Sequence, residues 1–315
     1  MFSDMKIVTG SANPMLAQAI CDHLGCKLTP SLTTTFSDGE IRIEIGDSVR
    51  GDDVFVVQST CNPVNDNLME LCLMLDALKR ASAARVTAVI PYYGYARQDR
   101  KVSPRAPISA KVAADFIRVA GGQRVVTVDL HAGQIQGFFD CPVDNLFCVP
   151  VLLEYLRPQM EGKDVVVVSP DAGGVERARA YAKRLKAGLA IVDKRRDRPN
   201  QAQAMHVIGD VENKFAIIVD DMIDTAGTLC AAAAVLKQHG AANIIACAAH
   251  GVLSGPAIDR INDSPELEEV VVTDTIPQED RISRCPKLRA ASVAALLGKT
   301  IHNIHTGSSV SVLFV

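Results

Sequence analysis

The chain has no tryptophan, few aromatic residues and no cysteines at metal-binding spacing. Its 315 residues are 48% hydrophobic but only 4% aromatic, so a core must come mainly from alanine, valine, isoleucine and leucine. The nine cysteines include no Cys-x-x-Cys pair, and most have apolar neighbours. These features favour reduced, buried thiols over a disulfide framework or a zinc site.

The chain also lacks a large excess of charge of one sign and long apolar runs. The net charge of −3 gives no general attraction to nucleic acid or to a membrane surface. No stretch approaches the roughly 18 apolar residues of a membrane span, and the first residues lack the basic and apolar regions of a secretion signal. We therefore expect a cytoplasmic globular protein without a nucleic-acid or membrane partner.

The length exceeds that of a usual single domain, and the chain contains a weak internal repeat. LKRASAARVTAVI at 78–90 resembles LKQHGAANIIACA at 236–248, and a strand, loop and helix pattern precedes each copy. This repeat favours two related α/β domains, which we place at residues 1–147 and 148–315. No Pro/Ser-rich linker separates them.

The most informative stretch is FAIIVDDMIDTAGT, residues 215–228. Its first five residues predict a buried parallel strand, the carboxylates Asp220 and Asp221 follow, and Asp224 opens the small, hydroxyl-rich run 225–228. Backbone N–H groups, two hydroxyls and a helix N-terminus suit a phosphate. The carboxylates suit ribose hydroxyls or a bound Mg²⁺. An acidic helix cap, the alternative, explains one aspartate but not the combination.

Two strand ends in the first half carry further candidates. The strand predicted at 86–90 ends in PYYGYARQDRK, whose aromatic faces and cations suit a nucleotide base and its phosphates. A solvated basic loop is the alternative. The strand at 125–128 ends in Asp129 and His131, which an extended chain points to one side, where they could hold a metal ion. A structural histidine is the alternative.

In the second half of the chain, two further predicted strands also lead into candidate site residues. The strand at 164–169 leads into PDAGG at 170–174, a second phosphate-type loop followed by a basic helix. The strand at 188–192 leads into DKRRDRPN at 193–200, which has four cations in five positions. This pattern predicts a basic loop beside the site, with a solvated turn as the alternative.

Together these stretches resemble the ribose-phosphate pyrophosphokinases, in particular their phosphate-dependent class I. VDDMIDTAGT is similar to the phosphoribosyl-diphosphate fingerprint that this family shares with type I phosphoribosyltransferases. FSDGEIRIEI, IPYYGYARQDRK, VDLHAGQIQGFFD, VSPDAGG, DKRR and HGVLSGPAI extend the match almost from end to end. The alternatives are a non-catalytic regulatory paralogue of the kinase and a phosphoribosyltransferase.

The resemblance implies a fold and a reaction. The fold is α/β, with two type I phosphoribosyltransferase-like domains that are each a mostly parallel sheet flanked by helices. The reaction transfers the diphosphoryl group of ATP to the anomeric hydroxyl of ribose 5-phosphate, giving phosphoribosyl diphosphate and AMP. The first domain would serve ATP and the second ribose 5-phosphate. A homo-oligomer, a hexamer by resemblance, and phosphate and ADP as effectors are also implied.

The resemblance assigns roles residue by residue, with residues 36–40 completing a neighbouring subunit's site. By role, the residues are Lys194 and Arg196 for catalysis; Phe36, Asp38, Gly39, Glu40, Arg97 and Gln98 for ATP; Arg196, Asp220, Asp221, Asp224, Thr225, Ala226, Gly227 and Thr228 for ribose 5-phosphate; His131 and Asp171 for Mg²⁺; and Arg50, Ser82, Arg105, Gln136, Ser309 and Ser311 for the regulatory site. The final helix, LLGKTIHNIH, departs from the family's charge pattern, which leaves the strength of regulation open.

We predict that Lys194→Ala and Arg196→Ala each lower kcat on the order of 10²–10³-fold, with much smaller changes in KM. Both cations would neutralise charge that develops only as the β-phosphoryl group transfers. Arg195→Ala is the control, because an extended segment points neighbouring side chains in opposite directions. Steady-state kinetics decide the matter. Sensitivity at Arg195, or losses confined to KM, would show that this segment only binds substrate.

Overall fold

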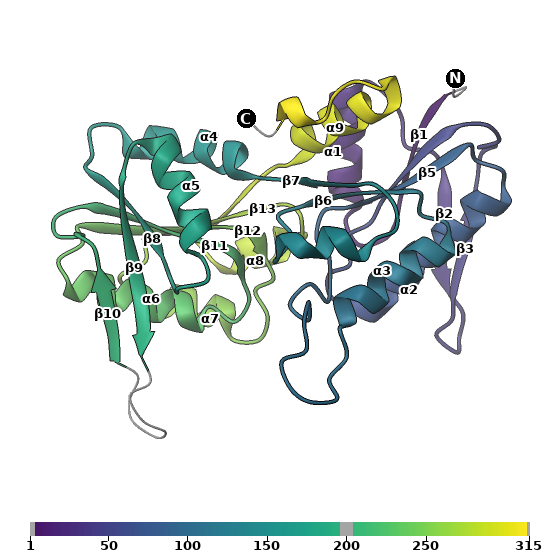
Figure 1. Cartoon of the computed structure of the whole chain (residues 1–315). Helices are drawn as coiled ribbons and strands as arrows, with labels where there is room; N and C mark the ends of the chain where they lie inside the picture. Colours follow the sequence, from purple (N-terminus) through teal and green to yellow (C-terminus); the bar gives the residue numbers. More distant parts are fainter. Residues whose placement is uncertain (1–3, 196–203, 314–315) are drawn as a thin grey trace. The chain divides into compact units, whose positions relative to one another are not determined.

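The computed structural model describes residues 4–195 and 204–313, which form two compact units (Figure 1). Unit 1 comprises Met1–Cys148, Thr275–Pro277 and Ser292–Val315, and unit 2 comprises Val149–Asp274 and Gln278–Ala291. No helix in the described ranges combines the length and apolarity that crossing a bilayer requires.

Unit 1 is built on a five-stranded parallel sheet with helices on both faces. Its strand order is β1-β4-β5-β6-β7, and β2 and β3 form a separate antiparallel hairpin. Helices α1 and α9 cover one face, and α2 and α3 cover the other (Figure 1). The bounds are β1 Met5–Thr9, α1 Pro14–Leu24, β2 Ser31–Thr35, β3 Ile41–Ile45, β4 Asp53–Val57, α2 Val64–Arg80, β5 Arg85–Ile90, α3 Ser109–Ala120, β6 Arg124–Val128, η1 Gly133–Phe138, β7 Val143–Leu146, α9 Ala294–Thr306 and η2 Ser311–Leu313.

Unit 2 is built on a seven-stranded sheet in the order β10-β9-β8-β11-β12-β13-β14. Every pair is parallel except β9 with β10. The bounds are α4 Val149–Met160, β8 Val165–Ser169, α5 Val175–Leu185, β9 Gly188–Arg195, β10 Ala204–Ile208, β11 Phe215–Ile223, α6 Gly227–Gln238, β12 Asn243–Gly251, α7 Ala257–Asp263, β13 Glu269–Thr273, α8 Glu279–Arg284 and β14 Leu288–Ala291.

The two sheets share one plan, which confirms the predicted fold class. The order β1-β4-β5-β6-β7 in unit 1 corresponds to β8-β11-β12-β13-β14 in unit 2. Helices cover both faces of such sheets, so their inner strands are apolar throughout. All five residues of β4 are buried, and so are the first five residues of β11.

The C-terminal segment belongs to unit 1, whereas the predicted division at 147/148 assigns it to the second domain. Helix α9 packs along α1. Gly298 permits this approach, because a Cβ at that position would lie 2.6 Å from the ring of His23. Contacts between segments so distant in the chain leave no pattern in either segment alone.

Local capping signals delimit α1 at both ends. The side chain of Asn13 accepts a hydrogen bond from Leu16 N at 3.2 Å, and Gly25 adopts the left-handed conformation with φ 68°. Strand β11 is longer than predicted, because it continues pairing with β12 as far as Ile223 and Gly251. Strand β9 likewise continues to Arg195 because it pairs with β10, so the predicted basic loop begins later than residue 193.

A buried carboxylate ties the C-terminal helix to the sheet of unit 1. Asp53 is fully buried and accepts two hydrogen bonds from Arg85, at 2.7 and 2.5 Å. His305 of α9 donates to the same carboxylate at 2.9 Å, and Arg85 also donates to the carbonyl of Ile304 at 3.0 Å. The cluster therefore joins β4, β5 and the end of α9.

We predict that Asp53→Asn lowers the free energy of unfolding by about 3 kcal/mol, because it leaves the half-buried Arg85 without its charged partner. Urea denaturation followed by circular dichroism measures the loss. Asp76→Asn is the matched control, since Asp76 pairs with Arg80 on the exposed surface of α2. Equal losses in the two variants would show that the cluster does not anchor α9.

Candidate functional site

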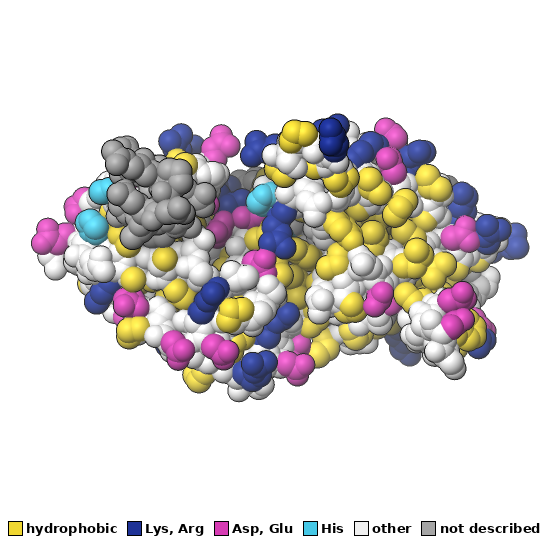
Figure 2. Space-filling model, turned by 90° about the horizontal axis from the view of Figure 1, so that it is seen from below, with side chains coloured by type: hydrophobic (Ala, Val, Ile, Leu, Met, Phe, Trp, Pro, Cys, Tyr) yellow, Lys and Arg dark blue, Asp and Glu magenta, His cyan; other side chains and the backbone are white. Residues whose placement is uncertain are grey.

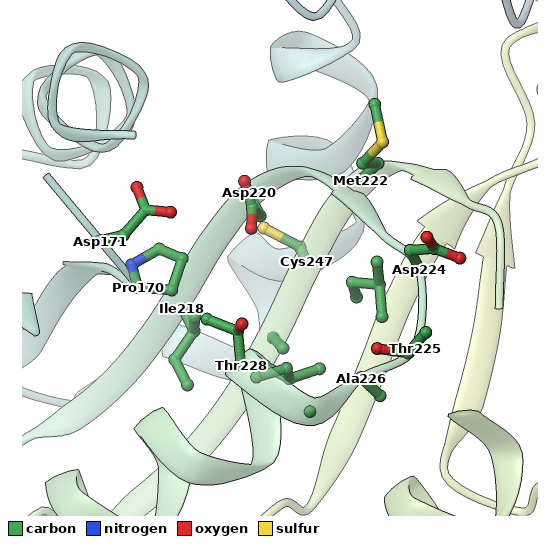
Figure 3. Close-up of a pocket in the computed structure, with 14 residues that line it drawn as sticks. Pro170, Asp171, Ile218, Asp220, Met222, Asp224, Thr225, Ala226, Thr228 and Cys247 are labelled. Carbon is green, nitrogen blue, oxygen red and sulfur yellow. The ribbon is translucent and has the colours of Figure 1, made fainter. Parts of the chain in front are cut away.

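A pocket lies in unit 2, at the carboxyl ends of strands β8 and β11 (Figure 3). Its wall consists of the loop before α6, the loop after β8 and side chains from β11 and β12. The lining residues are Pro170, Asp171, Ile218, Asp220, Met222, Ile223, Asp224, Thr225, Ala226, Gly227, Thr228, Leu229, Ala246 and Cys247. Ligands of open α/β sheets bind at this kind of edge.

The loop 224–228 has the geometry of an anion site. Ala226 adopts the left-handed conformation with φ 58°, and its carbonyl accepts from Cys230 N at 3.0 Å as α6 begins. The first N–H groups of a helix have no partner within the helix and carry partial positive charge. The pocket therefore receives the N-terminus of α6 together with the side chains of Thr225 and Thr228.

The two aspartates of the predicted acidic pair lie in different surroundings, one at the pocket and one in the interior. Asp220 lines the pocket, whereas Asp221 is buried and its N–H donates to Asp220 Oδ1 at 2.8 Å. Arg177 of α5 lies 3.4 Å from Asp220 and 3.5 Å from Asp221. Burial, with Asp221 adding to it, raises the pKa of Asp220 to about 7, and Arg177 opposes this shift. Asp220 can thus gain or lose a proton near neutral pH.

The second phosphate-type loop closes on itself. Asp171 Oδ1 accepts from Gly174 N at 3.0 Å, and the Ser169 hydroxyl donates to the Asp171 carbonyl at 2.7 Å. A Cβ on Gly174 would lie 2.8 Å from that hydroxyl, so a side chain there would displace the hydroxyl from its bond. Asp171 is exposed and lines the same pocket as Asp220, from the neighbouring strand end (Figure 3).

In unit 1 the loop after β1 corresponds to the loop after β8, and side chains of the chain itself accept hydrogen bonds from its donors. The loop after β1 offers Ser11 N and Ser11 Oγ, and both donate to the carboxylate of Glu70, each at 2.5 Å. Ala12 N donates to Gln58 Oε1 at 3.0 Å, and both Glu70 and Gln58 are buried. A carboxylate of the chain thus takes the donors of this loop in unit 1.

The residues predicted for ATP lie on two loops of unit 1. Residues 36–40 form the tip of the β2–β3 hairpin, where Phe36 is 52% exposed and its N–H donates to Glu40 O at 2.8 Å. Arg97 and Gln98 are exposed on the loop after β5, and the Gln98 side chain accepts from the Ser109 hydroxyl.

The expectation of several aromatic faces beside Arg97 is wrong for two tyrosines. Tyr92 and Tyr93 are buried. The hydroxyl of Tyr93 donates to Ala110 O at 2.8 Å, and its ring packs edge-on against Phe139. Both residues are part of the unit 1 interior, because the loop turns back over the sheet.

The predicted Asp-x-His geometry is also wrong. Strand β6 ends at Val128, and Asp129 has φ 41°, so the alternation of an extended chain does not apply. The Asp129 carboxylate accepts from Cys148 N at 2.8 Å and is buried, whereas His131 is exposed in the next loop. His131 belongs to unit 1 and Asp171 to unit 2. Among the residues described, no three His, Cys, Asp or Glu side chains form a metal cluster.

The remaining predicted residues are only partly brought together. Arg50 and Ser82 lie close, because Gly51 N donates to Ser82 O at 2.9 Å, and Ser309 and Ser311 share a hydrogen bond of 2.7 Å. Arg105 is exposed with φ 66°, and Gln136 bonds within η1. Lys194 lies in β9, and Arg196 falls outside the described residues.

A second hollow is apolar and lies between α2 and α3 of unit 1. Leu68, Met69, Cys72, Val112 and Phe116 line it, and Met69 and Phe116 are more than half exposed. Figure 2 shows hydrophobic side chains, in yellow, gathered on the surface of unit 1. An apolar area of this kind marks an interaction surface more often than a sugar-phosphate site.

Fold and pocket define a class: a two-unit α/β protein with a pocket at the ends of parallel strands. Residues 5–121 match the N-terminal domain of ribose phosphate pyrophosphokinase, and residues 196–315 match the phosphoribosyl synthetase-associated domain.

Relatives match almost the whole chain. The ribose-phosphate pyrophosphokinase of Caldanaerobacter subterraneus subsp. tengcongensis is 59% identical over 99% of this chain and 98% of the relative. That of Xanthomonas campestris pv. campestris is 57% identical over the same shares. The crystal structure of phosphoribosylpyrophosphate synthetase from Mycobacterium smegmatis superposes with a TM-score of 0.92 at 43% identity, covering 97% of this chain and 100% of that one.

The chain therefore belongs to the ribose-phosphate pyrophosphokinase family. The predicted family is confirmed, and with it an enzyme of the transferase class that serves nucleotide biosynthesis. Matches of this length and identity do not favour a phosphoribosyltransferase or a non-catalytic paralogue.

We predict that the affinity for ribose 5-phosphate falls as the pH is lowered through about 7. Protonated Asp220 accepts hydrogen bonds from ribose hydroxyls less well than its carboxylate does. The KM for ribose 5-phosphate, measured from pH 6 to about 8.5, tests this.

Asp220→Asn is the control for the same titration. The variant should have a raised KM at high pH and should retain only the titration of the substrate's own phosphate, near pH 6. An identical pH profile for wild type and variant would contradict the assignment of Asp220.

Proposed function

We propose that this chain transfers the diphosphoryl group of ATP to the anomeric hydroxyl of ribose 5-phosphate, giving phosphoribosyl diphosphate and AMP. The observation that carries the proposal is the pocket that combines the anion loop 224–228 with Asp220 and Asp171. A phosphate on the loop and ribose hydroxyls on the carboxylates are what a sugar phosphate requires. The family membership supplies the reaction.

Within unit 2, the 5-phosphate would bind to residues 224–228 and the ribose hydroxyls to Asp220. Asp221 would act through Asp220, because the guanidinium of Arg177 lies beside both carboxylates, so a change at Asp221 alters how Asp220 is held. The loop 170–174 would face the diphosphate side. Asp220→Asn and Asp221→Asn should both raise the KM for ribose 5-phosphate and leave that for ATP largely unchanged.

On the ATP side, we assign the exposed groups of unit 1. Phe36 offers an exposed ring to a nucleotide base, and Arg97 offers a planar guanidinium to phosphates. Asp38, Gly39 and Glu40 form the rest of the hairpin tip, and Gln98 lies beside Arg97. The hairpin would serve a neighbouring subunit.

Magnesium is the proposed metal, with Asp171 and His131 as its protein ligands. Mg²⁺ is commonly held by one or two carboxylates together with substrate phosphates, which suits the exposed carboxylate of Asp171. When bound, the ion would neutralise charge on the diphosphate. Lys194 and Arg196 would add charge stabilisation during transfer, and the other residues would position the reactants.

A homo-oligomer, with a hexamer as the specific proposal, is supported by the apolar hollow between α2 and α3 and by its exposed Met69 and Phe116. Light scattering tests it, and an active monomer would count against it.

Phosphate is the proposed activator and ADP the proposed inhibitor, acting at Arg50, Ser82, Arg105, Gln136, Ser309 and Ser311. Hydroxyls and guanidinium groups offer donors to an anion. Activity that does not respond to phosphate, together with ADP inhibition that is purely competitive with ATP, would contradict this regulation.

The reaction is tested by ³¹P NMR of ATP, Mg²⁺ and ribose 5-phosphate with the protein. We expect resonances of phosphoribosyl diphosphate and AMP to appear together in equal amounts. Formation of ADP would indicate transfer of a single phosphoryl group, and a lack of turnover would indicate a non-catalytic paralogue. Either result would overturn the proposal.

A further inference from the structure

The segment Leu253–Arg260, which follows β12, contacts the phosphate loop at successive carbonyl groups. Leu253 N donates to Ile223 O at 2.9 Å and Ser254 N donates to Asp224 O at 3.0 Å. Arg260 Nη1 donates to Thr225 O at 2.8 Å. Three consecutive carbonyls, that of Ile223 at the end of β11 and the first two of the loop 224–228, are thus held by one neighbouring segment.

These contacts also set the directions in which the loop's N–H groups point. In a planar trans peptide, the carbonyl and the following N–H point in opposite directions. The peptides that join residues 224, 225 and 226 are trans. With the carbonyls of Asp224 and Thr225 directed toward the segment, the N–H groups of Thr225 and Ala226 are directed away from it. Adjacent N–H groups with one orientation form an anion-binding concavity.

Among the described residues, only Arg260 donates a side-chain hydrogen bond to the Thr225 carbonyl. Its backbone carbonyl accepts from Cys230 Sγ at 3.5 Å, which links α7 to α6. Its guanidinium lies 3.3 Å from where a Cβ on Gly227 would be, so glycine at 227 leaves the space it occupies. Arg260 is an exposed residue of α7, and its planar guanidinium reaches the loop across this space.

We propose that Arg260 is a positioning residue for the phosphate loop. It holds the Thr225 carbonyl outward and so keeps the Ala226 N–H oriented for an anion. The nature of that anion, the 5-phosphate of a sugar phosphate, rests on the proposed function. Without the guanidinium, the 225–226 peptide can rotate, and the loop loses a preorganised donor before any substrate binds.

Hydrogen exchange measured by mass spectrometry on the ligand-free protein tests the positioning directly. Arg260→Ala should speed exchange in peptides that cover residues 224–228, and Arg260→Lys, which retains a donor, should have a smaller effect. Arg284→Ala is the control, because Arg284 is an exposed arginine of the same unit outside the pocket. Thermal denaturation establishes that each variant is folded. If Arg260→Ala does not fold, Arg260→Lys carries the test.

Calorimetric titration with ribose 5-phosphate completes the experiment. Arg260→Ala should raise the Kd on the order of tenfold. A raised Kd with unchanged exchange would show that Arg260 acts by charge alone, which overturns the positioning role. Unchanged Kd overturns it as well. Both measurements are independent of turnover, so a wild-type protein that fails the ³¹P NMR test would contradict the proposed function and not this inference.

Discussion

The pairing of β11 with β8 on one side and β12 on the other is the constraint on which the candidate site depends. Parallel pairing brings the carboxyl ends of these three strands to one edge. The loops that follow them contribute Asp171, the run 224–228 and the segment 253–260. Pro170 and Cys247, which are 77 positions apart in the chain, thereby line one pocket, without any of the loops being long.

The two units share one sheet plan but differ at the loops that follow the strands, because different groups occupy these loops. In unit 1 the buried carboxylate of Glu70 takes the donors of Ser11. In unit 2 the counterpart of that loop, which follows β8, has Asp171 exposed at an open pocket, and the loop before α6 lines the same pocket. Satisfying buried donors internally stabilises a fold, whereas leaving donors at an open pocket costs stability and permits binding. This difference is consistent with placing the sugar phosphate in unit 2.

Carboxylates outnumber cations around the pocket: Asp171, Asp220 and Asp224 line it, and Arg177 approaches from α5. Arg177 faces both Asp220 and Asp221, yet burial and the proximity of the two carboxylates dominate, so the pKa of Asp220 is raised. A carboxyl that titrates near neutral pH responds to small changes in its surroundings, including a bound anion or metal ion.

The sequence determined features that depend on neighbours along the chain. Asn13 and Gly25 delimit α1 because capping is local, and the run 215–228 identified a phosphate-type loop because its strand, acids and small residues are contiguous. The fold class and the family followed in the same way from patterns repeated along the chain.

Only the tertiary structure decided which of these groups meet. Asp220 and Asp221 are neighbours in sequence, yet one lines the pocket and the other is buried. Tyr92 and Tyr93 became core residues, and Arg260 became a partner of Thr225. The physical reason is that burial and hydrogen bonding between distant segments depend on how sheets and helices pack, and no local pattern records that packing.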